Sequence, residues 1–132
     1  DSCQAPHFPA YILFASDPDW SNETGQLWRI DTDGVVHLVE TDMGTTNDMR
    51  CDSEGNLNVT RYGKGTIAVL SPAGQLQEEI PLQGKNPTNI AFGGPEGRTA
   101  FVTVGDRGCI EAFRTRHPGR SWILLHPDLH DD

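Results

Sequence analysis

Several features that point to common protein functions are scarce in this sequence. Its 132 residues include only 3 cysteines, and its 10 basic residues stand against 19 acidic ones, for a net charge of −9. No Cys-x-x-Cys pair is present, which argues against a structural zinc site. The basic residues form no stripe, so the electrostatic signature of nucleic-acid binding is missing and we expect no nucleic-acid partner.

Long apolar runs are also missing. The longest clear run covers residues 11–15, far below the roughly 20 residues that cross a bilayer, so we expect a soluble protein without a membrane partner. The chain begins at Asp1 and shows no signal peptide, which indicates a mature form or a fragment. A cytoplasmic and a secreted location both stay open. The sequons at Asn22 and Asn58 matter only if the protein is secreted.

The common catalytic signatures do not occur. The sequence contains no G-x-S-x-G elbow, no H-E-x-x-H and no cysteine beside a histidine. The three cysteines, Cys3, Cys51 and Cys109, are compatible with one disulfide and a free thiol or with three buried thiols.

Glycine and proline are plentiful, with 14 and 9 residues, and the sequence repeats itself with a period near 42. "TNDMRCDSEGNLNVT" from Thr46 resembles "TNIAFGGPEGRTAFVT" from Thr88. The hairpin segments that follow also repeat: "GQLWRIDTDG" from Gly25, "GTIAVLSPAG" from Gly65 and "GCIEAFRTRHPG" from Gly108. This period matches the roughly 40–50 residues of a four-stranded propeller blade.

Each repeat contains short alternating or β-rich segments separated by glycine-containing turns, and no segment shows a sustained helical period. We therefore predict an all-β protein, a β-propeller of about three four-stranded blades. The strands of the second blade are expected near 48–52, 56–61, 65–71 and 75–80. The blades are expected at about 10–45, 46–87 and 88–126, with a tail at 127–132.

Three blades are fewer than the 4–8 that typically close a propeller. An open arc would expose large sheet faces, which implies a partner. Three explanations stay open: two copies close a six-bladed ring as a homodimer, the chain is part of a longer one, or the blades have repacked.

Asn47 and Asp48 stand directly before a strand-like run and are the first candidates for a metal site. Calcium takes amide and carboxylate oxygens together. Because neighbouring strand residues point to opposite faces, the pair can share one ion only if it lies in the loop before the strand. Asn89, at the matching point one repeat later, is the third candidate. The alternative is that both residues only satisfy backbone groups at a turn.

Three segments resemble the SMP-30/gluconolactonase/luciferin-regenerating enzyme family: "DPDWSNETGQLWRIDTDG", "MRCDSEGNLNVTRYGKGTIAVLSPAGQ" and "GKNPTNIAFGGPEGRTAFVT". The resemblance runs from about Ile12 to Trp122. It implies a six-bladed propeller with a divalent cation in its channel and hydrolysis of lactones or related esters. Calcium is the first expectation for the cation, with Zn²⁺, Mg²⁺ and Mn²⁺ as alternatives.

The resemblance also implies roles for particular residues. Asp48 corresponds to the catalytic aspartate of the family, and Asn47 and Asp48 to metal ligands. Asn89 is expected to face the substrate, a small lactone or ester. Independently of the resemblance, Arg61 is a candidate for facing an anionic substrate, although such an arginine more often packs over an aromatic side chain or pairs with a surface acid. Two motifs that lie a blade apart in the family are fused at Asn47-Asp48, and the blades that supply a metal-binding glutamate are missing. A non-catalytic binding or scaffold module that has lost the metal site is therefore the alternative function.

Overall fold

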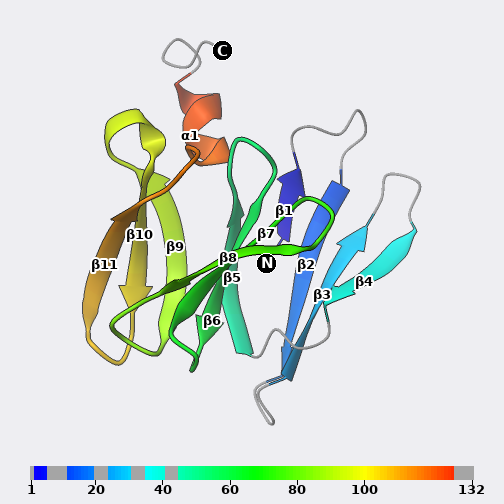
Figure 1. Cartoon of the computed structure of the whole chain (residues 1–132), viewed down its shortest axis with the longest axis horizontal. Helices are drawn as coiled ribbons and strands as arrows, with labels where there is room; N and C mark the ends of the chain where they lie inside the picture. Colours follow the sequence, from blue (N-terminus) through cyan, green and yellow to red (C-terminus); the bar gives the residue numbers. More distant parts are fainter. Residues whose placement is uncertain (1, 6–11, 20–23, 31–34, 41–44, 127–132) are drawn as a thin grey trace.

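The fold consists of three antiparallel sheets that follow one another along the chain (Figure 1). The computed structural model describes residues 2–5, 12–19, 24–30, 35–40 and 45–126, and it describes side chains for Val35 and for 46–126. The first sheet contains β1 (Ser2–Ala5), β2 (Ile12–Asp19), β3 (Thr24–Ile30) and β4 (Val36–Glu40). The second contains β5 (Thr45–Cys51), β6 (Leu57–Tyr62), β7 (Thr66–Leu70) and β8 (Leu76–Pro81).

The third sheet has three strands among the described residues: β9 (Pro87–Gly93), β10 (Thr99–Val104) and β11 (Cys109–Arg114). A short 3₁₀ helix, η1 (Pro95–Gly97), joins β9 to β10, and the helix α1 (Arg120–Leu125) follows β11. The repeat pattern predicts a fourth strand here, and α1 lies where that strand is expected. β1 lies ahead of position 10, where the first blade is expected to begin.

The turns repeat as the strands do. Gly55 and Gly97, which are 42 positions apart, have φ angles of 83° and 69°. This left-handed region is open to glycine at little steric cost. A glycine therefore occupies the turn between the first two strands in each of two successive sheets. The sequence repeat thus corresponds to a repeat of turns in the structure.

The three sheets lie side by side in chain order, with neighbouring sheets packed face to face (Figure 1). The core between the second and third sheets contains Ile67 of β7 and four residues of the third sheet: Ile90, Ala100, Val102 and Val104. Each of these side chains is at most 1% exposed. On the other side of the second sheet, β5 packs against β1, β2 and β3. The second sheet is thus covered on both faces, and its strand β5 contacts both neighbouring sheets.

The predicted fold class is confirmed: the chain is built of β-strands arranged as part of a propeller. Cys51 is disulfide-bonded and Cys109 has a free thiol. This is the first of the two alternatives for the cysteines, one disulfide and a free thiol. Asn58 is 3% exposed, so its sequon is closed to a glycan in this fold. Asn22 and the predicted tail at 127–132 lie outside the described residues. Within the described part of the chain, no helix has the length and apolar character needed to cross a membrane.

Candidate functional site

The candidate site begins with an irregularity in the second sheet. β5 pairs with β6 through Thr46 with Arg61 and through Met49 with Val59, and the register shifts between these pairs. Two residues of β5, Asn47 and Asp48, therefore stand opposite the single residue Thr60. This arrangement is a β-bulge, which bends a strand and redirects its side chains, and such bulges are common next to active sites.

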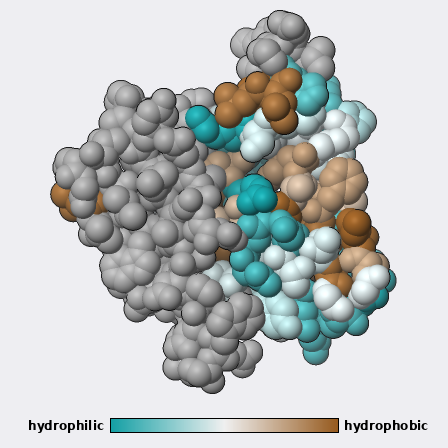
Figure 2. Space-filling model, turned by 180° about the vertical axis from the view of Figure 1, so that it is seen from behind, coloured by the Kyte–Doolittle hydropathy of each residue, from teal (hydrophilic) through white to brown (hydrophobic). Residues whose placement is uncertain are grey.

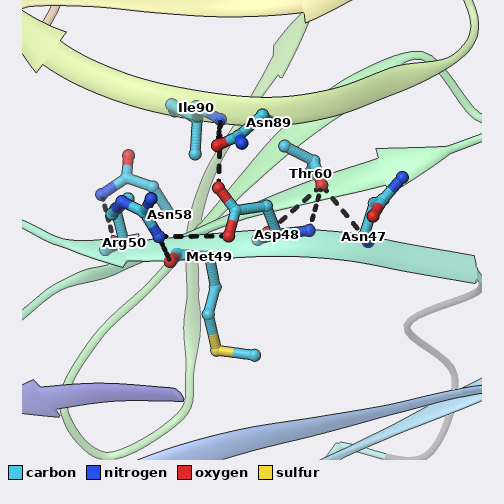
Figure 3. Close-up of polar contacts among 8 residues, drawn as sticks. All are labelled: Asn47, Asp48, Met49, Arg50, Asn58, Thr60, Asn89 and Ile90. Carbon is cyan, nitrogen blue, oxygen red and sulfur yellow. Dashed lines mark hydrogen bonds and ion pairs between the residues drawn. The ribbon is translucent and has the colours of Figure 1, made fainter. Parts of the chain in front are cut away.

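The hydroxyl of Thr60 holds the bulge in place (Figure 3). It accepts hydrogen bonds from the backbone N–H of Asp48 at 2.8 Å and of Asn47 at 3.3 Å. It also lies 3.2 Å from the carbonyl oxygen of Asp48, to which it can donate. One buried side chain thus replaces the ladder bonds that the extra residue disrupts.

The bulge changes how the pair is oriented. Figure 3 shows the side chains of Asn47 and Asp48 on the same side of β5, with the Met49 side chain on the opposite side. The sequence placed the pair directly before a strand, and that placement is wrong. Both residues lie within β5 (Thr45–Cys51), and the bulge provides what strict alternation along the strand would forbid.

Asp48 is 6% exposed, and its carboxylate has partners on both oxygens. Oδ1 lies 3.1 Å from Nη1 of Arg50, and Oδ2 accepts the backbone N–H of Ile90 at 3.2 Å. Ile90 belongs to β9 in the next sheet, so Asp48 ties two sheets together. A buried carboxylate requires such partners, because leaving it unpaired would carry a large desolvation penalty.

Asn89 lies directly beside this carboxylate. Its side-chain oxygen accepts the same N–H of Ile90 at 2.8 Å, so the oxygens of Asn89 and Asp48 converge on one donor (Figure 3). Asn89 itself is exposed. A shallow depression runs outward from it and is lined by Arg50, Asn89, Phe101 and Ile110, among others. The fold therefore brings Asp48 and Asn89 together from two neighbouring sheets, and Asn47 precedes Asp48 on the same side of β5.

Arg61 does not join this group. Its guanidinium lies 2.8 Å from the carboxylate of Glu79 on β8, and its side chain is 14% exposed. Burial opposes ionisation of Glu79, but hydrogen bonds from Thr66 and Lys64 and the charge of Arg61 lower its pKa below the usual value of 4.5. Arg61 thus forms an ion pair with Glu79. Pairing with an acidic residue was the alternative to contact with a substrate.

Two residues of the site were not predicted from the sequence. Arg50 carried a usable signal, because residues two apart on a strand share a face and Arg50 follows Asp48 by two. Thr60 carried none, since its bond to the bulge joins residues 12 positions apart. Asn58, also buried, donates its amide to the carbonyl of Arg50 at 3.4 Å and so keeps a hydrogen bond.

The oxygens at this site suit a hard cation in kind but are few in number. Asn47, Asp48 and Asn89 provide one carboxylate and two amides, whereas calcium takes about 6–8 oxygen ligands. Among the residues that the structure describes, no group of three or more histidine, cysteine, aspartate and glutamate side chains could hold a metal ion. Arg50 also competes for the Asp48 carboxylate. These residues can supply part of a coordination shell, and water or further residues must supply the rest.

Fold and site together define a partial β-propeller with a polar cluster where β5 and β9, the first strands of two successive sheets, meet. The family model described as the SMP-30/Gluconolactonase/LRE-like region matches residues 48–106. The predicted family resemblance is thus confirmed over these residues.

Two curated relatives are similar in sequence. The chain is 33% identical to a 6-deoxy-6-sulfogluconolactonase of Pseudomonas putida over 126 residues, covering 84% of this chain and 41% of the relative. It is 28% identical to regucalcin of Xenopus laevis over 101 residues, covering 76% of this chain and 33% of that protein. The chain therefore spans about two fifths or less of the length of these relatives.

One solved structure supports the fold. It is described as a calcium-binding protein, regucalcin, from Agrobacterium tumefaciens, and it superposes with a TM-score of 0.58 at 20% identity. The match covers 97% of this chain and 42% of that structure. At this identity the likeness concerns the fold alone.

Proposed function

We propose that the protein carrying this chain hydrolyses lactones or related esters with the help of a divalent cation. The observation that supports this most strongly is the 33% identity to a relative named 6-deoxy-6-sulfogluconolactonase, over 84% of the chain. The convergence of Asp48 and Asn89 on one backbone N–H, with Asn47 beside Asp48 on β5, is the local feature consistent with it. Relatives named as a lactonase and as regucalcin do not favour the alternative of a scaffold module.

The chemistry assigned to the residues is simple acyl transfer to water. A bound divalent cation would polarise the lactone carbonyl and stabilise negative charge on its oxygen. Asp48 would take the proton from the attacking water as a general base. As the ring C–O bond breaks, the proton moves to the departing ring oxygen, and the product is a hydroxy acid. Arg50, whose side chain is 43% exposed, has room to leave the Asp48 carboxylate when substrate binds.

Calcium is the cation proposed first. Asn47, Asp48 and Asn89 would supply oxygen ligands, and calcium accepts a flexible shell that water can complete. Zn²⁺ prefers nitrogen and sulfur ligands, which this cluster lacks among the described residues. Mg²⁺ and Mn²⁺ stay as alternatives that the same oxygens would serve.

The location proposed is a compartment that allows disulfides to persist. Cys51 is disulfide-bonded, and disulfides are rare where cytosolic reductants keep thiols reduced. Thiol titration of the unfolded, unreduced protein is expected to find one reactive thiol, that of Cys109. Three reactive thiols would remove the support for a secreted location.

The function is tested by hydrolysis of an aldonolactone, followed as acid release, with millimolar calcium and with a chelator. Asp48→Asn keeps the size of the side chain but removes the base, so activity is expected to fall about 100-fold or more. Glu96→Gln is the matched control, because it removes one carboxylate whose side chain is 72% exposed and takes no part in the site.

Each result has a clear meaning. Calcium-dependent hydrolysis that Asp48→Asn abolishes and Glu96→Gln leaves intact would support the proposal. A wild-type protein that neither hydrolyses lactones nor gains thermal stability from calcium, Mg²⁺ or Mn²⁺ would contradict it, since a ligand that binds only the folded state must stabilise that state. That outcome would favour the non-catalytic binding or scaffold module.

A further inference from the structure

A small cavity lies between the second and third sheets, and its lining is separate from that of the candidate site. Its volume is about 150 Å³. The second sheet contributes Asn58, Val69 and Ile80 to its wall, and the third sheet contributes Phe92. Of the described residues that line it, none lines the depression beside Asn89. Both walls belong to described sheets, so the cavity results from the packing of the second sheet against the third.

The second and third sheets have matching positions, which show why a cavity forms between them. Thr60 pairs with Ile67 across β6 and β7, and Thr103 pairs with Ile110 across β10 and β11, so the two pairs are equivalent. Thr60 and Ile67 are both 0% exposed, on the face that the third sheet covers. Thr103 and Ile110 are exposed, on the face of the third sheet that points away from the second. We call this face the open face, and Figure 2 shows hydrophobic atoms at the surface on the side of the molecule that it occupies.

Asn58 stands where the third sheet has an aromatic residue. It precedes Thr60 by two positions on β6, as Phe101 precedes Thr103 on β10, and residues two apart on a strand share a face. Phe101 lies on the open face, whereas Asn58 lies in the contact between the two sheets. Protein cores are normally packed without large voids. The amide side chain is smaller than a phenyl ring, so the two sheets enclose a space at this position.

The side-chain oxygen of Asn58 has no hydrogen-bond partner among the described residues. Asn58 is 3% exposed, and its amide nitrogen donates to the carbonyl of Arg50 at 3.4 Å. Figure 3 shows the amide oxygen turned away from that carbonyl. A buried acceptor without a partner is costly, and native structures rarely contain one. The wall of the cavity therefore contains an acceptor that a donor group inside the cavity would satisfy.

Other polar groups of the wall are held in place by hydrogen bonds. Asp52 accepts the amide nitrogen of Asn56 at 3.0 Å, which fixes the side chain of Asn56. The hydroxyl of Thr115 donates to the carbonyl of His117 at 2.9 Å, which fixes the segment that carries the imidazole. An imidazole nitrogen donates or accepts according to the tautomer. The wall also includes three apolar side chains: Val69, Ile80 and Phe92.

The charged groups around the cavity already have partners. The carboxylate of Asp52 accepts backbone and side-chain N–H groups from its own turn. Arg114 pairs with Glu96 at 3.3 Å. Arg116 and Glu78 are both exposed, with Nε and Oε1 3.9 Å apart. Neither sign of charge is in excess, so the wall favours a neutral ligand over an ion.

We propose that this cavity binds a small neutral molecule rich in hydroxyl groups, such as a monosaccharide or a cyclic polyol. A hydroxyl group both donates and accepts, so such a ligand would donate to the oxygens of Asn58 and Asn56 and bond with His117. Its C–H groups would pack against the apolar part of the wall. Sites for drug-sized ligands measure roughly 300–1,000 Å³, so this cavity limits the ligand to about the size of one sugar ring.

The test is titration of D-xylose and myo-inositol into the ¹⁵N-labelled chain, followed by NMR. A Kd in the millimolar range is expected, because so small a ligand makes few contacts. The side-chain amide of Asn58 and the backbone N–H groups of Thr115 and His117 are expected to shift. Asn58→Leu keeps the size of the side chain but removes the acceptor, so the Kd is expected to rise about tenfold or more.

Two further variants sharpen the test. Asn58→Phe introduces the side chain that the third sheet has at this position, and it is expected to fill the cavity and abolish binding. Gln83→Leu is the matched control for Asn58→Leu, because it removes an exposed amide outside the cavity. The spectrum of each variant shows whether the fold is kept, and Asn58→Leu decides the test if Asn58→Phe does not fold.

Polyol binding that Asn58→Leu weakens and Gln83→Leu leaves unchanged would support the proposal. A titration that shifts no resonance of the cavity wall would overturn it, because the cavity would then hold only water. Equal affinities for the wild type and Asn58→Leu would overturn it too. Acetate and methylammonium test the class of ligand, and tighter binding of either ion at the same resonances would overturn the neutral class. Binding is measured without lactone or divalent cation, so failure here is separate from failure of the proposed hydrolysis.

Discussion

At the middle of the second sheet Asn58 is 3% exposed, whereas Phe101, which holds the matching place in the third sheet, is 40% exposed. Each pairs with a small apolar residue on the next strand: Asn58 with Val69, and Phe101 with Ala112. The polar residue is inside and the aromatic residue is outside. Hydropathy alone would reverse this order, so burial in this fold depends on which face is covered by another sheet.

The comparison also explains the polar content of the covered face. Asp48, Asn58 and Thr60 are tolerated inside because each has a hydrogen-bond partner in the structure. On the third sheet, Asn89 and Thr103 occupy the matching positions at the surface, where water can serve them. The second sheet therefore depends on specific polar contacts, and the third sheet has an apolar face that no described residue covers.

The largest difference is expected at the two equivalent isoleucines. Ile67→Ala removes a fully buried side chain from the core between the sheets and is expected to lower the free energy of unfolding by about 2–5 kcal/mol. Ile110→Ala, at 64% exposure, is expected to stay within about 0.5 kcal/mol in dilute solution. Urea unfolding of both variants measures this. Equal losses would mean that the open face is covered in the single chain as well.

A smaller difference is expected at the two equivalent threonines. Thr60→Val deletes the hydroxyl that serves the bulge and leaves buried backbone groups without a partner, at a cost of about 1–3 kcal/mol. Thr103→Val loses a hydroxyl contact with Thr88 at the surface and is expected to have little effect. Denaturant unfolding distinguishes the two. Thr60→Ser keeps the hydroxyl and should recover most of the loss; a serine variant as weak as the valine variant would count against the hydrogen bond.

The smallest effect is expected on stability in acid, where a glutamate of the second sheet is compared with one of the third. Glu79 is held by Thr66, Lys64 and Arg61, while Glu111 of β11 accepts the backbone N–H groups of Gln83 and Gly84. Burial raises the pKa of both carboxyls, but the hydrogen bonds and nearby cations outweigh it, so the pKa of each is lowered below 4.5.

A pKa lowered by folding means that the contribution to stability is present above pH 4.5 and is lost as the pH falls through the folded-state value. The melting temperature is therefore expected to drop in this acid range. Glu79→Gln and Glu111→Gln should each lessen that drop while lowering the melting temperature near pH 7. Melting curves between about pH 3 and pH 7 measure it, and an unchanged pH dependence in both variants would contradict the assignment.

Much of the fold could be predicted from the sequence. The strands expected at 56–61 and 65–71 correspond to β6 (Leu57–Tyr62) and β7 (Thr66–Leu70), and the repeated glycines mark the turns. These features are local, since alternation and positive φ act within a few residues. The third sheet was harder, because α1 follows β11 and six residues are too few to show a helical period.

The candidate site could be predicted only in part. Of the residues named from the sequence, the fold brings Asp48 and Asn89 together at the N–H of Ile90, but the orientation of Asn47 and Asp48 on one side of β5 was not predicted. The expected match of Asn47 with Asn89 is off by one residue, because β9 has a register shift at the same place as β5: Thr88 and Asn89 lie opposite Thr103 as Asn47 and Asp48 lie opposite Thr60, so Asp48 matches Asn89. Arg61 was expected at the substrate, yet its partner Glu79 lies 18 positions away, on a strand with which β6 does not pair.

The sequence by itself determined that this chain forms repeated antiparallel sheets, where its turns lie and which family it resembles. These properties follow from residue types and spacings within one repeat. Only the tertiary structure decided that Thr60 would hold a bulge at Asp48 and that Asp48 would bind the backbone of Ile90, 42 positions away. It also decided that Ile67 is buried and Ile110 exposed. The physical reason is that burial and bulge geometry are set by the sheet that packs on a strand, and no single repeat contains that sheet.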